Sequence, residues 1–236
     1  MTDGKEKGFF KKNWKLLIGA GCFALFLLLI VLLKTVGVET DPATGKEIGL
    51  SGLNFAVRDA IGLRMRWYDL TEYLGYFAIA SAAAFAVWAI VRFCLSRFDL
   101  RKMGFDFLVL GALYLAVVCF YCFFELVVIN YRPVLLEGVA EASFPSSHTM
   151  ISITVFVSAA RILHRRFLPT VSPVLFSLPF WALAAFVTVG RLVSGVHWLT
   201  DIIGGVLLSL SLIFLFSFFS DLVPIETDEK SIPIRE

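Results

Sequence analysis

The sequence has little charge, few histidines and few cysteines for a chain of 236 residues. Charged residues make up 17% of it, and 21 Lys and Arg against 19 Asp and Glu leave a formal charge of only +2. This balance lacks the basic excess of a nucleic-acid-binding domain, so no nucleic-acid partner is expected. With 58% of its residues apolar, the chain has too little polar surface for a small secreted disulfide-rich domain. So many apolar residues with so little net charge also exclude a disordered chain.

The cysteines lack the spacing of a metal or redox site. Cys119 and Cys122 form a C-x-x-C pair, but the pair falls inside a long apolar run and no second pair accompanies it. Cys22 and Cys94 also lie in or beside apolar runs. We therefore interpret all four as buried thiols that pack as small hydrophobic side chains.

Apolar residues are in excess, at 58% of the chain with a mean hydropathy of +0.83. A helix that rises about 1.5 Å per residue needs about 20 residues to cross a hydrocarbon core of about 30 Å. Helices also satisfy their own backbone hydrogen bonds in lipid. We expect an all-α fold, a six-transmembrane-helix bundle that forms a single membrane-embedded domain over 1–236. The expected crossings are 16–33, 74–91, 107–129, 149–163, 171–189 and 198–219.

Basic residues indicate the orientation, because cytoplasmic loops retain Lys and Arg. With the N-terminus inside, 14 of the 21 basic residues fall in cytoplasmic segments and seven fall outside. Both termini are therefore predicted to be cytoplasmic, with tails at 1–15 and 220–236, in a multi-pass protein of the cell membrane. No small-residue cleavage site follows the first run, so we expect a retained anchor.

An outer loop is expected at 34–69. Within it, Leu53, Val57 and Ile61 approximate the spacing of an apolar helical stripe. One interpretation is an interfacial helix whose arginines, such as Arg58, face the lipid headgroups. The other is a packed loop that covers the bundle, and the sequence leaves both open.

Polar side chains at the ends of the apolar runs gather on the predicted outer side. Arg132 follows the third run and His148 precedes the fourth. Arg191 ends the fifth run, while His197 and Asp201 lie at the start of the sixth. Placing a charged side chain near the hydrocarbon core costs free energy, so such residues are by default candidates for a functional site. Three separate segments therefore predict one site on one membrane face.

His197 and Asp201 are four residues apart, so on a helix they would share a face. The carboxylate could then hold one imidazole nitrogen and leave the other free as a nucleophile or base. Asp201 would raise the pKa of His197, whereas the positive end of a helix would lower it. The sequence does not decide between these effects. A buried hydrogen bond that merely joins two helices is the structural alternative.

Arg132 and Arg191 carry planar guanidinium groups suited to two oxygens of one phosphate. Ser146 and Ser147 lie where the fourth helix should begin, so a hydroxyl and unpaired backbone N–H groups would point to the same region. Taken alone, these serines indicate an ordinary helix cap. Beside two arginines and a histidine they predict a phosphate-binding site.

In their order and spacing, these clusters resemble the three signature motifs of the type 2 phosphatidic acid phosphatase superfamily, in its integral membrane lipid phosphatase branch. The matching residues are Arg132-Pro133, then Pro145-Ser146-Ser147-His148, then Arg191 with His197 and Asp201.

The resemblance implies a metal-independent lipid phosphatase with no cofactor. His197 would attack phosphorus to form a phosphohistidine and Asp201 would support it, while His148 would protonate the leaving oxygen and then help to activate water. The residues implied to hold the phosphoryl oxygens are Arg132, Arg191, Ser146 and the backbone around Ser147. The implied partners are membrane lipids and a lipid phosphate at the outer face. Undecaprenyl diphosphate is weakly favoured over phosphatidylglycerophosphate and phosphatidate.

Three positions depart from the family pattern. Glu125 stands where the first motif usually has Lys, and we expect it to pair with an arginine of the site or to meet a polar or cationic headgroup; a purely structural ion pair is equally plausible. Ser147 replaces a Gly, a change that a helix start tolerates. Gly190 replaces a Ser, which removes one hydroxyl that could donate to phosphate.

Other functions are compatible with parts of the pattern. Ser194-Gly195 near a histidine is typical of an intramembrane serine protease, but that function leaves both arginines and His148 unexplained. A catalytically weak lipid-phosphate binder or transporter would keep the pocket and lose turnover. A structural scaffold would need none of these side chains. The sequence gives no oligomeric state.

Overall fold

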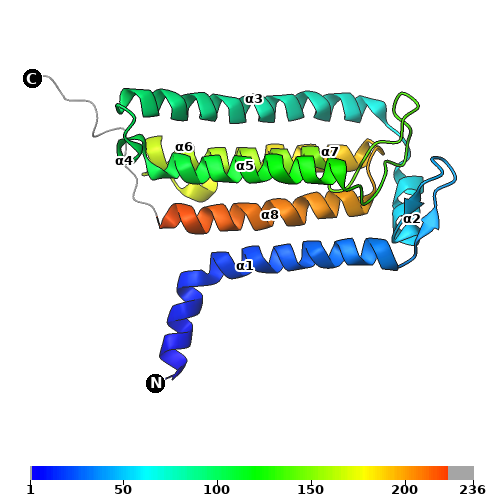
Figure 1. Ribbon diagram of the computed structural model, residues 1–236, viewed down its shortest axis with the longest axis horizontal. Helices are drawn as coiled ribbons and strands as arrows, with labels where there is room; N and C mark the ends of the chain where they lie inside the picture. Colours follow the sequence, from blue (N-terminus) through cyan, green and yellow to red (C-terminus); the bar gives the residue numbers. More distant parts are fainter. Residues whose placement is uncertain (1, 223–236) are drawn as a thin grey trace, which may run out of the picture.

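The structure is a computed structural model that describes residues 2–222. It is an all-helical bundle with one minimal β-hairpin, and its long helices lie roughly side by side (Figure 1). The helices and strands, in chain order, are α1 (Thr2–Thr35), β1 (Glu39–Thr40), β2 (Glu47–Ile48), α2 (Ser51–Ile61), α3 (Met65–Leu95), α4 (Leu100–Met103), α5 (Phe105–Leu126), α6 (Ser147–Phe167), α7 (Pro173–Val193) and α8 (Leu199–Asp221).

Five helices of the described chain are long and apolar enough to cross a membrane. They confirm five of the expected crossings, in α1, α3, α5, α7 and α8, and the chain is a multi-pass membrane protein. The helices extend beyond several of the expected runs. In particular, α3 begins at Met65, so the outer loop expected at 34–69 ends earlier than predicted. The placement of the termini in the cytoplasm stays a prediction.

The sixth expected crossing, 149–163, lies within α6, which is 21 residues long but is not among the five apolar helices. Its composition follows from its place in the bundle, because α6 packs against α3, α5, α7 and α8. Polar side chains such as Thr149, Ser152 and Ser158 are buried along it. A helix surrounded by protein does not need a lipid-facing surface. The count of six crossings therefore stays a prediction.

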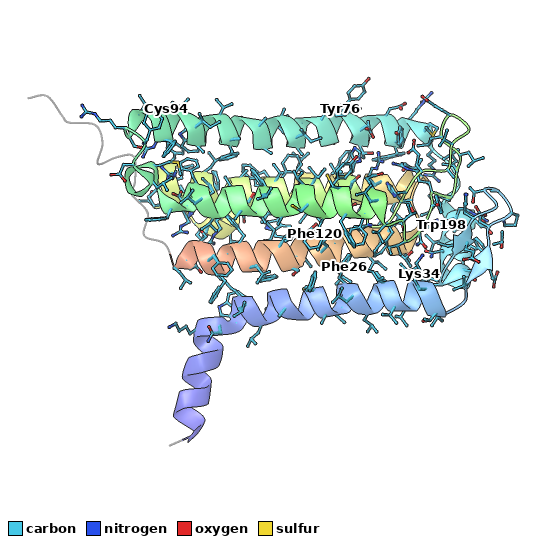
Figure 2. All side chains as sticks on the ribbon, viewed as in Figure 1. Phe26, Lys34, Tyr76, Cys94, Phe120 and Trp198 are labelled. Atoms are coloured by element: carbon cyan, nitrogen blue, oxygen red, sulfur yellow. The ribbon has the colours of Figure 1, made fainter. Side chains whose placement is uncertain are left out.

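Phenylalanine side chains form much of the core between α1, α5 and α8. Phe26 of α1 points into the bundle (Figure 2), where its ring stacks on Phe144 at 5.6 Å and meets Phe124 edge-on at 5.7 Å. Phe144 belongs to the loop before α6, and it packs where Gly204 leaves α8 without a side chain. A Cβ at Gly204 would collide with the Phe144 ring, lying 2.7 Å from its Cζ atom and nearer still to Cε2. This close approach fixes the loop before α6 against α8.

The outer loop contains both the hairpin and the helix α2. A helix does form there, and Leu53 of the predicted apolar stripe is 48% exposed, whereas Asn54 is buried. The Asn54 amide nitrogen donates to the Gly49 carbonyl and to the Thr200 hydroxyl at the start of α8. Arg58 does not point freely outward, since it pairs with the buried Asp41 at 2.8 Å. Specific polar contacts therefore hold α2 over the end of α8.

The cysteines are not buried as expected. All four are free thiols; Cys22 is partly exposed, and Cys94, Cys119 and Cys122 are exposed on the surface of the bundle. Figure 2 shows Cys94 near one end of α3. In a membrane bundle the outer surface is apolar as well, so hydrophobicity alone does not place a side chain in the core.

At the opposite end from α2, an ion pair is buried between helices. Arg166, in the last turn of α6, binds Asp106 of α5 through two hydrogen bonds of 2.8 and 2.6 Å, and both side chains are almost fully buried. The guanidinium group also lies 4.3 Å from the centre of the Phe107 ring. The pair therefore joins α5 to α6.

Candidate active site

The ends of five helices meet near α2 and bring the predicted residues together. The first turns of α3, α6 and α8 lie there with the last turns of α5 and α7 (Figure 1). The segment 127–146 connects α5 to α6, and the segment 194–198 connects α7 to α8. The N-termini of α6 and α8 therefore lie in one region, where the positive ends of the two helix dipoles favour an anion.

His197 and Asp201 are adjacent, as expected, although His197 precedes α8 and is not part of it. The Nδ1 atom of His197 lies 3.6 Å from the Oδ2 atom of Asp201, slightly beyond hydrogen-bond distance. Asp201 is fully buried, and its carboxylate accepts from the Trp198 backbone N–H at 2.9 Å and from the Asn130 amide at 3.4 Å. These bonds hold the carboxylate beside the imidazole.

Burial and the neighbouring positive charges of Arg132 and Arg191 hold the pKa of His197 well below its usual value. His197 is only 5% exposed. Of the two opposing effects weighed from the sequence, the effect of Asp201 does not prevail. Because the imidazole is neutral at neutral pH, one ring nitrogen keeps a lone pair.

Arg191 is completely buried and lies between the two histidines. Its Nη2 atom is 3.4 Å from Nε2 of His197, and its Nη1 atom donates to Oε2 of Glu72 at 3.1 Å. The guanidinium group also lies 4.8 Å from the centre of the Tyr68 ring. Its Nε atom has no hydrogen-bond partner in the part of the chain that the structure describes.

His148, in the first turn of α6, faces the same carboxylate from the other side. Its Nε2 atom lies 3.2 Å from Oε2 of Glu72. Its Nδ1 atom is buried and has no hydrogen-bond partner among residues 2–222. One carboxylate oxygen therefore connects the second histidine to the buried arginine.

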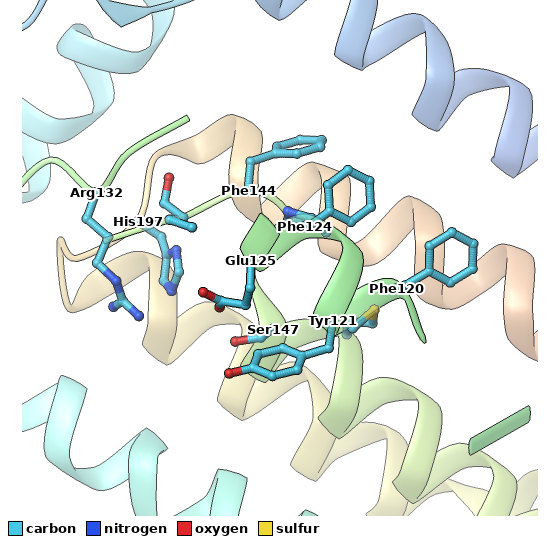
Figure 3. Close-up of a pocket in the computed structure, with 12 residues that line it drawn as sticks. Phe120, Tyr121, Phe124, Glu125, Arg132, Phe144, Ser147 and His197 are labelled. Atoms are coloured by element: carbon cyan, nitrogen blue, oxygen red, sulfur yellow. The ribbon is translucent and has the colours of Figure 1, made fainter. Parts of the chain in front are cut away.

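Arg132 lies in the segment between α5 and α6 and pairs with Glu141, the distance from Nε to Oε2 being 3.0 Å. Its Nη1 atom is buried without a partner within the described residues. Glu125, at the end of α5, points into the same pocket as Arg132, His197 and Ser147 (Figure 3). Neither expected ion pair of Glu125 forms, because other carboxylates occupy both arginines.

Ser146 and Ser147 lie where the sequence places them, before and at the start of α6. Ser146 is the N-cap residue, yet its side chain makes no capping hydrogen bond. Its backbone N–H donates to the Asp201 carbonyl at 3.0 Å, and its hydroxyl is buried with no partner in the described chain. The ordinary cap considered from the sequence therefore does not form, and the hydroxyl is available to another group.

Two connected cavities adjoin these side chains. One has a volume of about 600 Å³ and is polar, with walls that include Glu72, Glu125, Arg132, Glu141 and His148. The other, of about 390 Å³, runs between α3, α5 and α6, and both cavities are lined by Glu72, Tyr121, Ser147 and His148. Apolar side chains such as Ile79, Val117 and Ile151 line the second cavity. A polar chamber thus opens into an apolar groove.

Glu72, Glu141 and Asn130 are the polar partners that sequence reasoning missed. Glu72 carried a signal, because it is an acidic residue close to the start of a long apolar run. The protease alternative loses its nucleophile, since the Ser194 hydroxyl donates to the Arg191 carbonyl at 2.7 Å, within the same helix end. No histidine is within hydrogen-bond reach of Ser194 in the described chain.

Gly190 has a packing role that the family pattern did not indicate. A Cβ at this position would lie 2.5 Å from Cγ2 of Thr71 and 3.3 Å from the Trp67 ring, both of α3. A serine would therefore meet α3 rather than the pocket. The interpretation of Gly190 as a lost phosphate donor is wrong.

The arrangement agrees with the comparisons to known proteins. Residues 129–222, which contain every predicted site residue except Glu125, match the model of the PAP2 superfamily. We call residues 129–222 the PAP2 segment, after the model that they match. No curated protein sequence matches the chain significantly.

A solved structure extends the likeness in fold beyond the PAP2 segment. It is the crystal structure of the first transmembrane PAP2-type phosphatidylglycerolphosphate phosphatase from Bacillus subtilis. The two share a fold with a TM-score of 0.59 over 92% of this chain and 98% of that chain, at 22% sequence identity. The family match and the shared fold confirm the resemblance found in the sequence.

Proposed function

We propose that this protein removes phosphate from a lipid phosphate at the outer face of the membrane through a phosphohistidine intermediate. The observation that carries the proposal is the set of contacts among two histidines and two arginines. Arg191 lies 3.4 Å from His197 and shares the Glu72 carboxylate with His148. Arg132 lines one cavity with His197 and another with His148. Several buried donors there lack a protein partner within the described residues, among them Arg132 Nη1, Arg191 Nε and the Ser146 hydroxyl. Donors without partners are costly unless an anion or water takes them. A phosphoryl group supplies oxygens for all of them.

His197 is the proposed nucleophile. Its neutral imidazole directs Nε2 to Arg191, so the Nε2 lone pair attacks phosphorus where the guanidinium group binds the phosphoryl oxygens. As the new P–N bond forms, the bond from phosphorus to the lipid oxygen breaks, and His148 donates a proton to that oxygen. Asp201 stabilises the positive charge that develops on His197, at a distance of 3.6 Å.

The second step restores the enzyme. A water molecule attacks the phosphohistidine, His148 takes a proton from it, and the P–N bond breaks to release inorganic phosphate. The positive charges of Arg132, Arg191 and the two helix N-termini stabilise the phosphoryl oxygens in both steps. The chemistry requires no metal ion, so activity is expected to persist in a chelator.

A lipid is the expected substrate because the polar chamber continues into the apolar groove between α3, α5 and α6. A phosphate head can occupy the chamber while the hydrocarbon chain lies in the groove. The related solved structure is that of a phosphatidylglycerolphosphate phosphatase. The phospholipid in that name is one of the three candidate substrates expected from the sequence. The distribution of basic residues supports the outer location, since Lys15, Arg161 and Arg165 lie at the other end of the bundle.

The test is hydrolysis by the purified full-length protein in detergent with a chelator present. The substrates are phosphatidate, phosphatidylglycerophosphate and undecaprenyl diphosphate, and the assay measures released phosphate. We expect hydrolysis of at least one of them, and no hydrolysis by His197→Ala. Lipid binding without phosphate release by the wild-type protein would instead support the catalytically weak binder. Activity that a chelator abolishes would contradict the proposed mechanism.

A further inference from the structure

Glu72 lies outside the PAP2 segment, yet it touches two residues of the site. Its Oε2 atom is 3.2 Å from Nε2 of His148 and 3.1 Å from Nη1 of Arg191. Glu72 belongs to the second turn of α3, about 60 residues before the matched segment begins. A single oxygen therefore links the proposed proton donor to the arginine that faces the nucleophile.

The packing of α3 holds this carboxylate in place. A Cβ at Gly75, one turn after Glu72, would lie 2.7 Å from Nε2 of His148, so the helix backbone closely approaches the imidazole ring. On the same side of α3, Thr71 meets Gly190 of α7. Two close approaches, one to α6 and one to α7, fix the turn that carries Glu72. The carboxylate thus has little freedom to leave the histidine.

The contact also distinguishes the two nitrogens of His148. Nε2 faces Glu72, whereas Nδ1 is buried and has no protein partner among the described residues. A carboxylate beside one ring nitrogen favours the protonated imidazole and fixes its orientation. The other nitrogen then carries a proton that it can give away. Burial of the ring and the positive charges of Arg191 and Arg132 oppose protonation of His148, and the Glu72 carboxylate is the neighbouring group that favours it.

We propose that Glu72 is a positioning residue that favours the protonated form of His148 and directs Nδ1–H to the leaving lipid oxygen. The inference rests on the proposed phosphatase function. In the first step the proton moves from Nδ1 of His148 to the lipid oxygen as its bond to phosphorus breaks, and Glu72 stays ionised and bonded to Nε2. In the second step Nδ1 takes a proton from the attacking water. The site therefore contains two carboxylate–imidazole pairs, His197 with Asp201 and His148 with Glu72.

The test compares two leaving groups, because a proton donor matters only when the leaving oxygen is strongly basic. Phosphatidate, or whichever lipid phosphate the wild-type protein hydrolyses, releases a basic oxygen, whereas p-nitrophenyl phosphate releases a weakly basic phenolate. For Glu72→Gln we expect kcat/KM to fall by at least about tenfold with the lipid and by less than about threefold with p-nitrophenyl phosphate. The alkaline limb of the lipid pH profile should also move to lower pH, since glutamine does not favour the imidazolium.

Asp69→Asn is the matched control, because it removes the same charge from an exposed position one turn earlier on α3. It should leave both substrates unaffected. Glu72→Asp keeps the charge and shortens the side chain, so it should show an intermediate loss with the lipid substrate alone. This variant decides the question if the glutamine variant does not fold, as judged by thermal denaturation in detergent.

The outcomes separate the inference from the proposed function. If the wild-type protein hydrolyses the lipid and Glu72→Gln is as active as wild type, the inference is wrong and the phosphatase function stands. Equal losses of kcat/KM with both substrates would mean that Glu72 acts through Arg191 and the phosphate, and this result would also overturn the inference. Increased activity of Glu72→Gln would show that the carboxylate competes with the substrate phosphate, which would overturn the inference as well. If the wild-type protein releases no phosphate from either compound, the proposed function itself has failed.

Discussion

Replacing Arg191 by lysine keeps the positive charge but removes the planar fork. The guanidinium group of Arg191 uses Nη1 for Glu72 and Nη2 for His197, and its Nε atom has no partner in residues 2–222. Lysine presents one nitrogen and cannot reach both neighbours and a phosphoryl oxygen together. A charge-assisted hydrogen bond contributes about 1.5–3 kcal/mol. Because about 1.4 kcal/mol corresponds to a tenfold change in rate, loss of one such bond should lower kcat/KM about 10- to 150-fold.

The assay is phosphate release from the preferred lipid, with vanadate inhibition measured beside it. Vanadate can adopt the five-coordinate geometry of the transition state, so its inhibition constant should rise in Arg191→Lys. Arg66→Lys is the control, because Arg66 is exposed at the start of α3. Wild-type kcat/KM and unchanged vanadate inhibition in Arg191→Lys would refute the role of the guanidinium group in holding phosphate.

Three further predictions concern stability, measured by thermal or chemical denaturation in detergent. Asp106→Asn removes the negative charge that accepts two buried hydrogen bonds from Arg166, so it should lower the free energy of unfolding by about 3–5 kcal/mol. A loss below about 1 kcal/mol would contradict this. Gly190→Ser restores the residue usual in the family but places a Cβ 2.5 Å from Thr71, so it should cost about 1–3 kcal/mol; unchanged stability would show that α3 yields easily. Folding lowers the pKa of His197, so the unfolded chain binds a proton on this residue more tightly than the folded protein does. The free energy of unfolding should therefore decrease as pH falls below about 6.5, the pKa of an unfolded histidine. Between pH 7.5 and 5.5 the wild-type protein should lose up to about 1.4 kcal/mol relative to His197→Asn, and a constant difference would contradict the lowered pKa.

The sequence was sufficient to predict the helical bundle and the convergence of the motif residues. Long apolar runs predict membrane helices whatever their partners are. The motif residues could be placed on one side of the membrane because the end of one crossing and the start of the next lie on the same side. Each of them lies next to such a helix end, namely Arg132, His148, Arg191 and His197. The helix α6 was harder to assign, since its buried Ser and Thr side chains reduce its hydropathy.

Partners from distant parts of the chain could not be predicted in the same way. Glu72 and Arg191 are 119 residues apart, and their contact depends on how α3 packs against α7. The unusual Gly190 is explained only by that packing, because the atoms that exclude a side chain belong to Thr71 and Trp67. Asn54 is similar, since its contact with Thr200 spans 146 residues. Motif spacing gives the chemistry of a site, and tertiary packing gives the residues that orient it.

The central claim is that His197 becomes covalently bonded to phosphorus, and chemical trapping tests it most directly. The protein would be mixed with substrate carrying radioactive phosphorus, quenched in alkali within the turnover time, digested and mapped. The account predicts a label on His197 that is stable to alkali and released by acid, present in the wild-type protein and absent from His197→Ala. Turnover without any trapped label in wild type and in a slowed His148→Ala variant, or a label on another residue, would contradict it.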